Sequence, residues 1–284
     1  MHERGPRMVV EGGGGVELHV DDAGDPEGQP LVFIHGYCQS TYAWRKQTES
    51  DLSRDFRMVM FDMRGHGDSG KPSAPEAYKD SQLWADDVAA VLETLDLRTA
   101  IIIAWSYAGY LVGDYLRHYG ADRLAAIALV SAVTVKGGEK ARPFNAAPFG
   151  ELFPALFSDE PDVITPAMER FIDLTVADPN VLTEDERAEI LTDCELVPAV
   201  AREAMMHRKL DNDDVLRELR IPVLCVHGTA DNIVLPASSE HNAKQISRSR
   251  LSIYDGIGHT PFIEDSVRFE RELRELAARS IMLR

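Results

Sequence analysis

Short apolar runs alternate with amphipathic stretches over much of this 284-residue chain, and this alternation restricts the possible folds more than any other feature. The runs are rich in β-branched residues, which is typical of strands buried on both faces. The runs expected to form strands are 31–34, 56–61, 100–105, 124–130, 221–226 and 250–254, with 16–20 as one arm of a hairpin. Helical spacing is found at 41–52, 81–95 and 265–279, and another helix is expected after Pro236. Because parallel strands need crossover connections, this order predicts an α/β fold with a mostly parallel, doubly wound sheet.

The alternation stops between residues 133 and 214. That stretch contains several prolines, many aromatic residues and acidic helical segments, but no clear strand. Open α/β folds bind their ligands at the carboxyl ends of the strands, and a helical block inserted there can cover the binding site. We therefore predict a core domain formed by residues 1–132 and 215–284, with residues 133–214 as a helical cap insertion.

The charge of the chain limits its partners. There are 30 Lys and Arg residues against 47 Asp and Glu residues, which gives a formal net charge of −17 at pH 7. Nucleic acids and anionic membrane surfaces attract positive charge, so neither is expected as a partner. The apolar runs are also too short to span a bilayer. The expected partner is a small-molecule substrate, and the composition is compatible with a homo-oligomer as well as a monomer.

The cysteines and the first residues bear on the compartment. Cys38, Cys194 and Cys225 form no CxxC pair, and any disulfide would leave one of them unpaired. This usage favours a reducing compartment, with the cysteines in packing roles and no structural zinc. Residues 1–7 are charged and lack the apolar stretch of a secretory signal. We expect a cytoplasmic protein.

Ser106 stands where the expected strand 100–105 stops and the helix-like stretch 107–112 begins. A tight turn at this point would push the serine hydroxyl out of the sheet. It would also place the backbone N–H of Tyr107 at a helix N-terminus, beside any negative charge that develops on a carbonyl attacked by Ser106. This segment alone is equally compatible with a serine that only caps the helix.

Other expected strand ends carry histidine, aspartate and glycine. They are the segments 35–37, 62–69, 227–231 and 256–259. Reading along the chain, a serine is followed by an acid, Asp231, and then by a histidine, His259. With the late helical insertion, this order resembles the α/β-hydrolase fold family over nearly the whole chain.

The resemblance implies a sheet of about eight strands and a role for each of these residues. Ser106 would be the nucleophile, Asp231 the acid and His259 the base, and the backbone N–H groups of Tyr37 and Tyr107 would form the oxyanion hole. The chemistry is consistent with these roles, because a serine hydroxyl needs a histidine to take its proton and a carboxylate to orient that histidine. The resemblance implies no cofactor and no metal.

One feature departs from the family's pattern. The usual nucleophile turn has glycine two residues before and two residues after the serine, whereas this chain has Ala104 and Ala108, with Gly109 one position later. A methyl group still allows close packing of strand and helix. The departure leaves open a noncatalytic, ligand-binding member of the fold.

Other polar residues have simpler explanations. Asp255 lies near His259 in sequence, but it belongs to the bend after a strand and is the weaker candidate for the acid. Asp62, His66 and Asp68 could suggest a metal site, although their glycine-rich spacing favours a structural turn. Cys38 has no obvious base beside it and is expected to pack.

The aromatic residues of the insertion suggest the substrate. The residues expected to line the pocket are Trp105, Phe144, Phe149, Phe153 and Phe157, although each could instead pack within the cap. The predicted function is hydrolysis of a carboxylic ester with a small to medium apolar acyl or alcohol group through an acyl-enzyme. Lactone hydrolysis, carbon–carbon bond hydrolysis and cofactor-free haloperoxidase or perhydrolase chemistry, all implied by the resemblance, use the same triad.

Overall fold

The computed structural model of the chain describes residues 7–282, and one sheet of eight strands forms its centre. The strand order is β1-β2-β4-β3-β5-β6-β9-β10; β1–β2 and β2–β4 are antiparallel, and every other neighbouring pair is parallel. The strands are β1 (Arg7–Glu11), β2 (Glu17–Gly24), β3 (Gln29–Ile34), β4 (Phe56–Phe61), β5 (Ala100–Trp105), β6 (Leu124–Val130), β9 (Val223–Gly228) and β10 (Ser249–Tyr254). Every residue of β5 and β6 is buried, as apolar runs in a covered parallel sheet require. The predicted fold class is confirmed.

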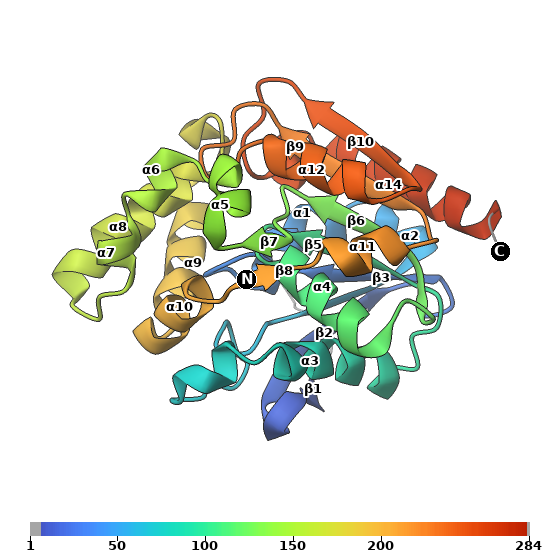
Figure 1. Cartoon of the computed structure of the whole chain (residues 1–284), viewed down its shortest axis with the longest axis horizontal. Helices are drawn as coiled ribbons and strands as arrows, with labels where there is room; N and C mark the ends of the chain where they lie inside the picture. The colour runs from blue at the N-terminus through green and yellow to red at the C-terminus, as the bar shows by residue number, and fades with distance from the viewer. Residues whose placement is uncertain (1–6, 283–284) are drawn as a thin grey trace.

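Helices cover both faces of the sheet (Figure 1). On one face α3, α4, α11 and α12 pack as successive neighbours, and α1, α2 and α14 cover the other. The helices of this part are α1 (Arg45–Thr48), α2 (Leu52–Asp55), α3 (Ser81–Thr94), α4 (Ala108–Tyr119), α11 (Asp213–Glu218), α12 (Ala237–Gln245), α13 (Pro261–Glu264) and α14 (Ser266–Met282). Three 3-10 turns accompany them, namely η1 (Gly13–Gly15), η2 (Thr41–Trp44) and η3 (Pro75–Tyr78).

The segment expected to be a single helix over 41–52 is divided into η2, α1 and α2. The side chain of Ser50 lies at the break between α1 and α2. Its hydroxyl donates to the carbonyl oxygen of Gln47 at 2.9 Å and accepts from the backbone N–H of Leu52 at 3.2 Å. Such side-chain bonds to the backbone compete with helical hydrogen bonds, so the helix stops and restarts at this point.

The insertion leaves the core after β6 and returns to it at α11. It forms the green to yellow group of helices in Figure 1, where α8 packs against both α7 and α9. Its elements are β7 (Val135–Lys136), α5 (Gly138–Ala141), η4 (Arg142–Phe144), α6 (Ala147–Gly150), α7 (Phe153–Leu156), α8 (Pro161–Leu174), η5 (Pro179–Val181), α9 (Glu184–Glu195), α10 (Ala199–Met206) and β8 (Leu210–Asp211). We propose that residues 133–214 act as a cap, as expected from the sequence.

No strand was expected in the insertion, yet β7 and β8 pair with each other in antiparallel fashion. Each has only two residues, too few for an alternating pattern to be recognised in the sequence. Their pairing joins the start of the insertion to its end. It thereby places residue 136 beside the end of α10.

Among residues 7–282, no helix is both long enough and apolar enough to cross a bilayer. The charged residues 1–6, which supported the expectation of a missing secretory signal, lie outside the described residues.

Candidate active site

Ser106 occupies the sharp turn between β5 and α4. Its φ of 57° lies in the left-handed region, which residues other than glycine rarely adopt. Its backbone N–H donates to the carbonyl oxygen of Val130 at 2.9 Å, and its own carbonyl accepts from Gly109 N–H at 3.1 Å. A conformation of this kind costs about 1–3 kcal/mol and persists only where the surroundings hold it, which is common at catalytic positions.

Close packing around Ser106 depends on two glycines other than those of the family's usual nucleophile turn. A Cβ on Gly109 would lie 2.4 Å from the carbonyl oxygen of Val133, and a Cβ on Gly36 would lie 3.2 Å from the Cβ of Ser106. Ala104 and Ala108 are fully buried, with their methyl groups accommodated in the core. The alanines therefore do not prevent the turn, because the closest approaches occur at Gly36 and Gly109.

Asp231 and His259 come together at the same edge of the sheet. Asp231 follows β9 and His259 lies between β10 and α13, and Asp231 Oδ2 is 2.6 Å from His259 Nδ1. The other carboxylate oxygen accepts from the backbone N–H groups of Ile233 at 2.8 Å and Val234 at 3.0 Å. With Nδ1–H bound to the carboxylate, the imidazole keeps its Nε2 lone pair for accepting a proton.

Backbone hydrogen bonds on both sides fix the loop that carries His259. The indole N–H of Trp105 donates to the carbonyl oxygen of His259 at 3.0 Å. The N–H of His259 donates to the carbonyl oxygen of Thr175 at 3.0 Å, and Thr175 is the C-cap residue that follows helix α8 of the insertion. The histidine is thus tied to the residue before Ser106 and to the proposed cap.

His227 makes a further contact with Asp231 that the sequence did not indicate. This fully buried histidine places Nε2 at 3.0 Å from Asp231 Oδ2 and 2.9 Å from the carbonyl oxygen of Val234. Because Nε2 of His227 faces two oxygen acceptors, we assign the ring proton to Nε2. Nδ1 then accepts a hydrogen bond from the Ser239 hydroxyl, which lies 2.7 Å away. Burial alone would raise the pKa of Asp231, but the electrostatic attraction and hydrogen bonds of the His259 and His227 rings favour the ionised carboxylate and hold this pKa below its ordinary value.

Replacing His227 tests whether it positions the carboxylate. In His227→Leu the carboxylate loses an N–H donor, and a hydrogen bond to a charged group contributes about 1.5–3 kcal/mol. The kcat of the ester hydrolysis predicted from the sequence should therefore fall about 10–100-fold, with KM little changed. His227→Gln keeps an N–H donor and should recover part of kcat. The matched control is His241→Leu, because His241 bonds to Asp213 instead. A loss of thermal stability without any change in kcat would assign His227 a purely structural role.

The loop after β3 brings Tyr37 next to Ser106. Within residues 7–282, the backbone N–H groups of Tyr37 and Tyr107 donate to no protein acceptor. Two buried histidines hold the loop, since His35 Nε2 accepts from Met63 N–H at 3.0 Å and His66 Nε2 accepts from Cys38 N–H at 3.2 Å. Both rings must therefore stay neutral for this loop to keep its shape.

The two histidines predict a dependence of stability on pH. Burial lowers the pKa of His35 to about 4 and that of His66 to about 3, below the ordinary value of 6.5. Between the lowered pKa of each folded histidine and the ordinary pKa of 6.5, the unfolded chain binds more protons than the folded chain. The folded state is therefore fully stabilised by the neutral rings above pH 6.5. It loses this stabilisation as the pH falls toward about 4 for His35 and about 3 for His66. Each histidine should contribute a slope of up to about 1.4 kcal/mol per pH unit in the free energy of unfolding measured with urea.

A variant separates this effect from the titration of carboxylates. His66→Gln can still accept from Cys38 N–H through its side-chain oxygen, and its free energy of unfolding should depend less steeply on pH below 6.5. His118→Gln, at an exposed position, should keep the steep dependence of the parent protein. Equal slopes in the parent and in His66→Gln would contradict the argument.

Neither Asp255 nor the thiol of Cys38 contacts His259. Asp255 accepts from the Thr229 hydroxyl at 3.2 Å, whereas Asp231 contacts His259. Cys38 is fully buried, and burial raises the pKa of its thiol to about 12, so the thiol stays protonated. Its expected packing role fits this environment.

The residues weighed as a metal site form a turn. The two carboxylate oxygens of Asp62 accept from the backbone N–H groups of Thr41 at 2.8 Å and Asp68 at 3.0 Å. His66 does not join them; instead His19 has a ring nitrogen within 4.8 Å of carboxylate oxygens of Asp62 and Asp68. The bonds to Thr41 and Asp68 are those that a structural turn needs.

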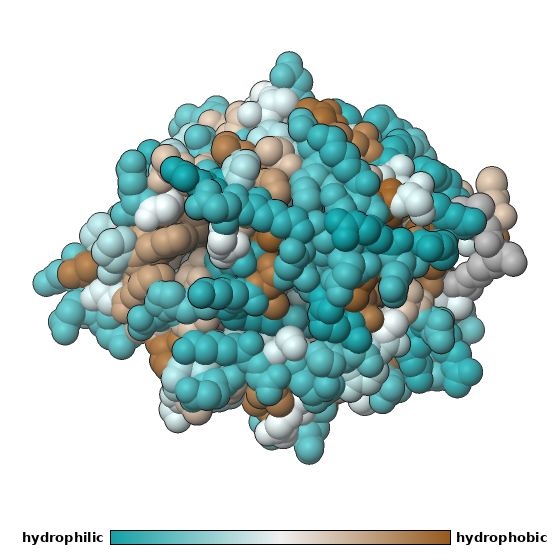
Figure 2. Space-filling view, viewed as in Figure 1, coloured by the Kyte–Doolittle hydropathy of each residue, from teal (hydrophilic) through white to brown (hydrophobic). Residues whose placement is uncertain are grey.

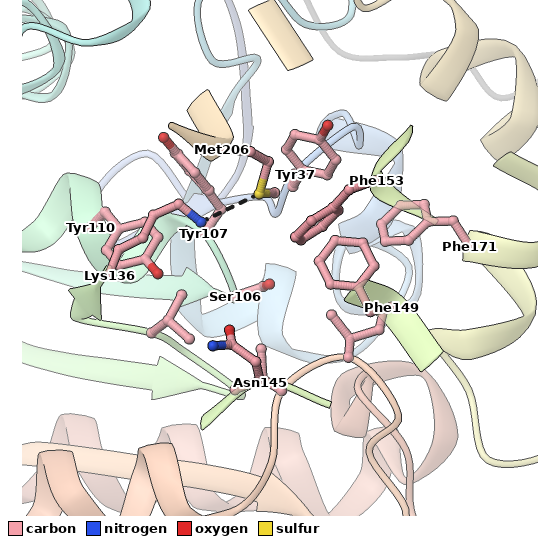
Figure 3. A pocket seen from close by; sticks show the side chains of 13 residues that line it. Tyr37, Ser106, Tyr107, Tyr110, Lys136, Asn145, Phe149, Phe153, Phe171 and Met206 are labelled. Carbon is pink, nitrogen blue, oxygen red and sulfur yellow. Dashed lines mark hydrogen bonds between the residues drawn. The ribbon is translucent and has the colours of Figure 1, made fainter. Parts of the chain in front are cut away.

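A narrow pocket opens beside Ser106, and Tyr37, Tyr107 and Ile233 are among the residues that line it. On one side of the serine Figure 3 shows three phenylalanines of the insertion, and on the other Lys136 with Tyr110. Phe149 contacts Phe153 edge-on at 5.0 Å and Phe171 at 5.5 Å between ring centroids. On the face seen in Figure 2, a recessed hydrophobic area beside the insertion interrupts a mainly hydrophilic surface.

Only part of the expected pocket lining is found there. Phe149 and Phe153 line the pocket, but Trp105, Phe144 and Phe157 do not. Trp105 precedes Ser106 in a strand whose side chains alternate, so its ring lies in the core against Trp44 and Phe262.

The other two phenylalanines pack away from the pocket for local reasons. Phe144 packs with Val135 and Ala141 and lies against His241. Phe157 stacks behind Phe153 at 5.9 Å between ring centroids. Phe171, an aromatic residue of the insertion that was not among the five expected lining residues, lines the pocket because of how α8 packs, and Lys136 was not anticipated at all.

The fold and the site place the chain in a known class. The sequence pattern of the alpha/beta hydrolase fold matches residues 29–266, and the chain belongs to this family. It is 30% identical to a non-heme chloroperoxidase of Streptomyces lividans over 86% of this chain and 90% of that protein. It is 28% identical to a bifunctional esterase/perhydrolase of Acinetobacter calcoaceticus over 86% and 90% of the two chains. An esterase structure from Rhodococcus sp. ECU1013 superposes with a TM-score of 0.91 and 31% identity, covering 96% of this chain and 99% of that one. These similarities identify an enzyme of the hydrolase type.

Proposed function

We propose that this enzyme hydrolyses carboxylic esters through an acyl-enzyme formed on Ser106. The observation that carries the proposal is the buried Asp231–His259 pair at 2.6 Å, tied through the Trp105 indole to the strained turn that holds Ser106. A serine in a left-handed turn, a histidine oriented by an ionised carboxylate and unpartnered backbone amides are the parts that acyl transfer requires.

The proposed mechanism follows from these groups. His259 Nε2 takes the proton of the Ser106 hydroxyl as its oxygen attacks the ester carbonyl, and Asp231 stays ionised and stabilises the imidazolium. The negative oxygen of the tetrahedral intermediate accepts from the N–H groups of Tyr37 and Tyr107, and removing one such donor typically costs about 3 kcal/mol of transition-state stabilisation. The alcohol leaves with the proton from His259. Water then attacks the acyl-enzyme by the same route and releases the carboxylic acid.

The pocket limits the size of the substrate. Phe149, Phe153 and Phe171 form an apolar wall beside Ser106 that suits a small to medium acyl or alcohol group. The relatives' names include esterases and peroxidases, and a peracid would form if hydrogen peroxide replaced water in the second step. Ester hydrolysis is the activity proposed, because the triad performs it with water alone.

Covalent labelling tests the proposal directly. A fluorophosphonate probe should label the native protein at Ser106, as peptide mass spectrometry would show, and heat-denatured protein should remain unlabelled. A p-nitrophenyl ester series of increasing acyl length then measures the substrate range. Absence of label under native conditions would contradict the enzyme mechanism and favour a noncatalytic ligand-binding protein.

A further inference from the structure

Lys136 brings a positive charge into the apolar pocket beside Ser106. It comes from β7, and the pairing of β7 with β8 places it opposite the phenylalanine wall (Figure 3). Its ammonium group lies 3.4 Å from the sulfur of Met206 and 5.8 Å from the centre of the Tyr110 ring. Within residues 7–282, no carboxylate forms an ion pair with it.

An ammonium group held in this way is costly for the free protein. Burial, and after it the positive charge of Arg208, lowers the pKa of Lys136 to about 8. A thioether and an aromatic ring replace only a small part of the lost hydration. A long flexible side chain such as lysine usually places its charge in water, so its position in the pocket suggests a ligand group that compensates the charge.

The residues around Lys136 also favour a negatively charged ligand group. A groove continues from the pocket past Lys136 to His207, Arg208 and Lys209, and no Asp or Glu is among its lining residues. Arg208 forms an ion pair with Asp114 at 2.6 Å, so, within the described part of the chain, the positive charges without an ion-pair partner in this groove are those of the lysines. The chain as a whole has a net charge of −17, so the local charge of this groove is opposite in sign to that of the whole chain.

We propose that the natural ester carries a carboxylate, and that Lys136 binds this carboxylate while Ser106 attacks the ester carbonyl. The inference rests on the proposed ester hydrolysis and narrows it to monoesters of dicarboxylic acids or esters of hydroxy acids. A carboxylate fits better than a phosphate dianion, because a single ammonium group faces the pocket and the neighbouring guanidinium is already paired. The phenylalanine wall then holds the apolar remainder of the substrate.

Matched pairs of substrates test the proposal and locate the carboxylate. In the first pair, monophenyl adipate carries a carboxylate on its acyl chain and phenyl hexanoate is the neutral ester of the same chain length. In the second pair, 4-carboxyphenyl hexanoate carries the carboxylate on its alcohol part, and phenyl hexanoate is again the neutral ester. The quantity compared is the ratio of kcat/KM for the carboxylated ester to that for the neutral ester. In one of the two pairs the parent enzyme should favour the carboxylated ester, and Lys136→Met should lower this ratio about 10–100-fold.

Two further variants separate charge from packing. Lys136→Arg keeps a positive charge and should retain most of the ratio. Lys79→Met removes a charge from an exposed position outside the pocket and should leave the ratio unchanged. Because each ratio is taken within one variant, a general loss of activity cancels.

The outcomes distinguish this inference from the proposed function. If phenyl hexanoate is hydrolysed but the ratio is the same in the parent and in Lys136→Met for both pairs, the inference is wrong and ester hydrolysis stands. If none of the esters is hydrolysed, ester hydrolysis itself fails. In that case, calorimetry of adipate binding tests the carboxylate site without catalysis. The parent protein should bind adipate more tightly than hexanoate, and Lys136→Met should bind the two with similar affinity.

Discussion

Ser106→Ala should fold like the parent and lose ester hydrolysis by about three to six orders of magnitude in kcat. The loss is this large because no other group can form the acyl-enzyme, and the residual rate would come from the oxyanion donors and substrate binding alone. The fold should survive because alanine keeps the same Cβ at a φ of 57°, so the substitution adds no backbone strain. Steady-state kinetics with a p-nitrophenyl ester measures the loss, and circular dichroism with thermal melting checks the fold.

The matched control for this variant is Ser131→Ala. Ser131 also has a positive φ, of 45°, and is fully buried at the end of the neighbouring strand β6. Its hydroxyl has no hydrogen-bond partner among residues 7–282, and it does not line the pocket. Ser131→Ala should therefore keep the parent's activity. A Ser106→Ala protein that retained more than about a hundredth of the rate would disprove the acyl-enzyme mechanism.

Asp231→Asn should lower kcat by about four orders of magnitude while changing KM little. In the parent, Asp231 Oδ2 accepts from His259 at 2.6 Å and lies 3.0 Å from His227 Nε2, so one oxygen faces two N–H groups. The other oxygen accepts from two backbone amides. An asparagine must turn its NH2 group toward one of these sets of donors. If it faces His259, that histidine must move its proton to Nε2, where it can no longer accept one from Ser106.

The neighbouring acid provides the comparison for Asp231→Asn. Asp255→Asn changes a carboxylate that contacts the Thr229 hydroxyl and not His259, and it should keep kcat within a few-fold of the parent. Measuring kcat and KM separately for both variants shows whether the loss lies in the chemical step. Equal losses in the two variants would mean that Asp231 has no special place in the mechanism.

The sequence predicted the sheet well because its signal is local. β4, β5 and β6 begin and end at the expected residues, since apolar runs and their ends are visible in the residues themselves. Fragmentation of the segment 41–52 could not be anticipated in the same way. The break between α1 and α2 involves the hydroxyl of Ser50. Its bonds to Gln47 and Leu52 can be identified only once the local backbone conformation is known.

Long-range packing explains what the sequence could not predict about the site. The missing glycines at 104 and 108 weakened the motif, while the close approach takes place at Gly36 and Gly109, which belong to separate segments. The sequence indicated His227 only as a residue at the end of a strand. Its contact with Asp231 could not be predicted, because it depends on the conformation of the turn between the two residues. Lys136 reaches the pocket through a two-residue strand pairing, which has no recognisable pattern.

The bond between His259 N–H and the carbonyl oxygen of Thr175 has a practical consequence for engineering. His259, the proposed general base, is held on one side by the core, through Trp105, and on the other by the insertion that we propose to act as a cap. Grafting the insertion of another relative to change the substrate range would therefore also alter the support of the general base. A graft that keeps residues 172–177 and replaces the aromatic wall before them separates recognition from turnover.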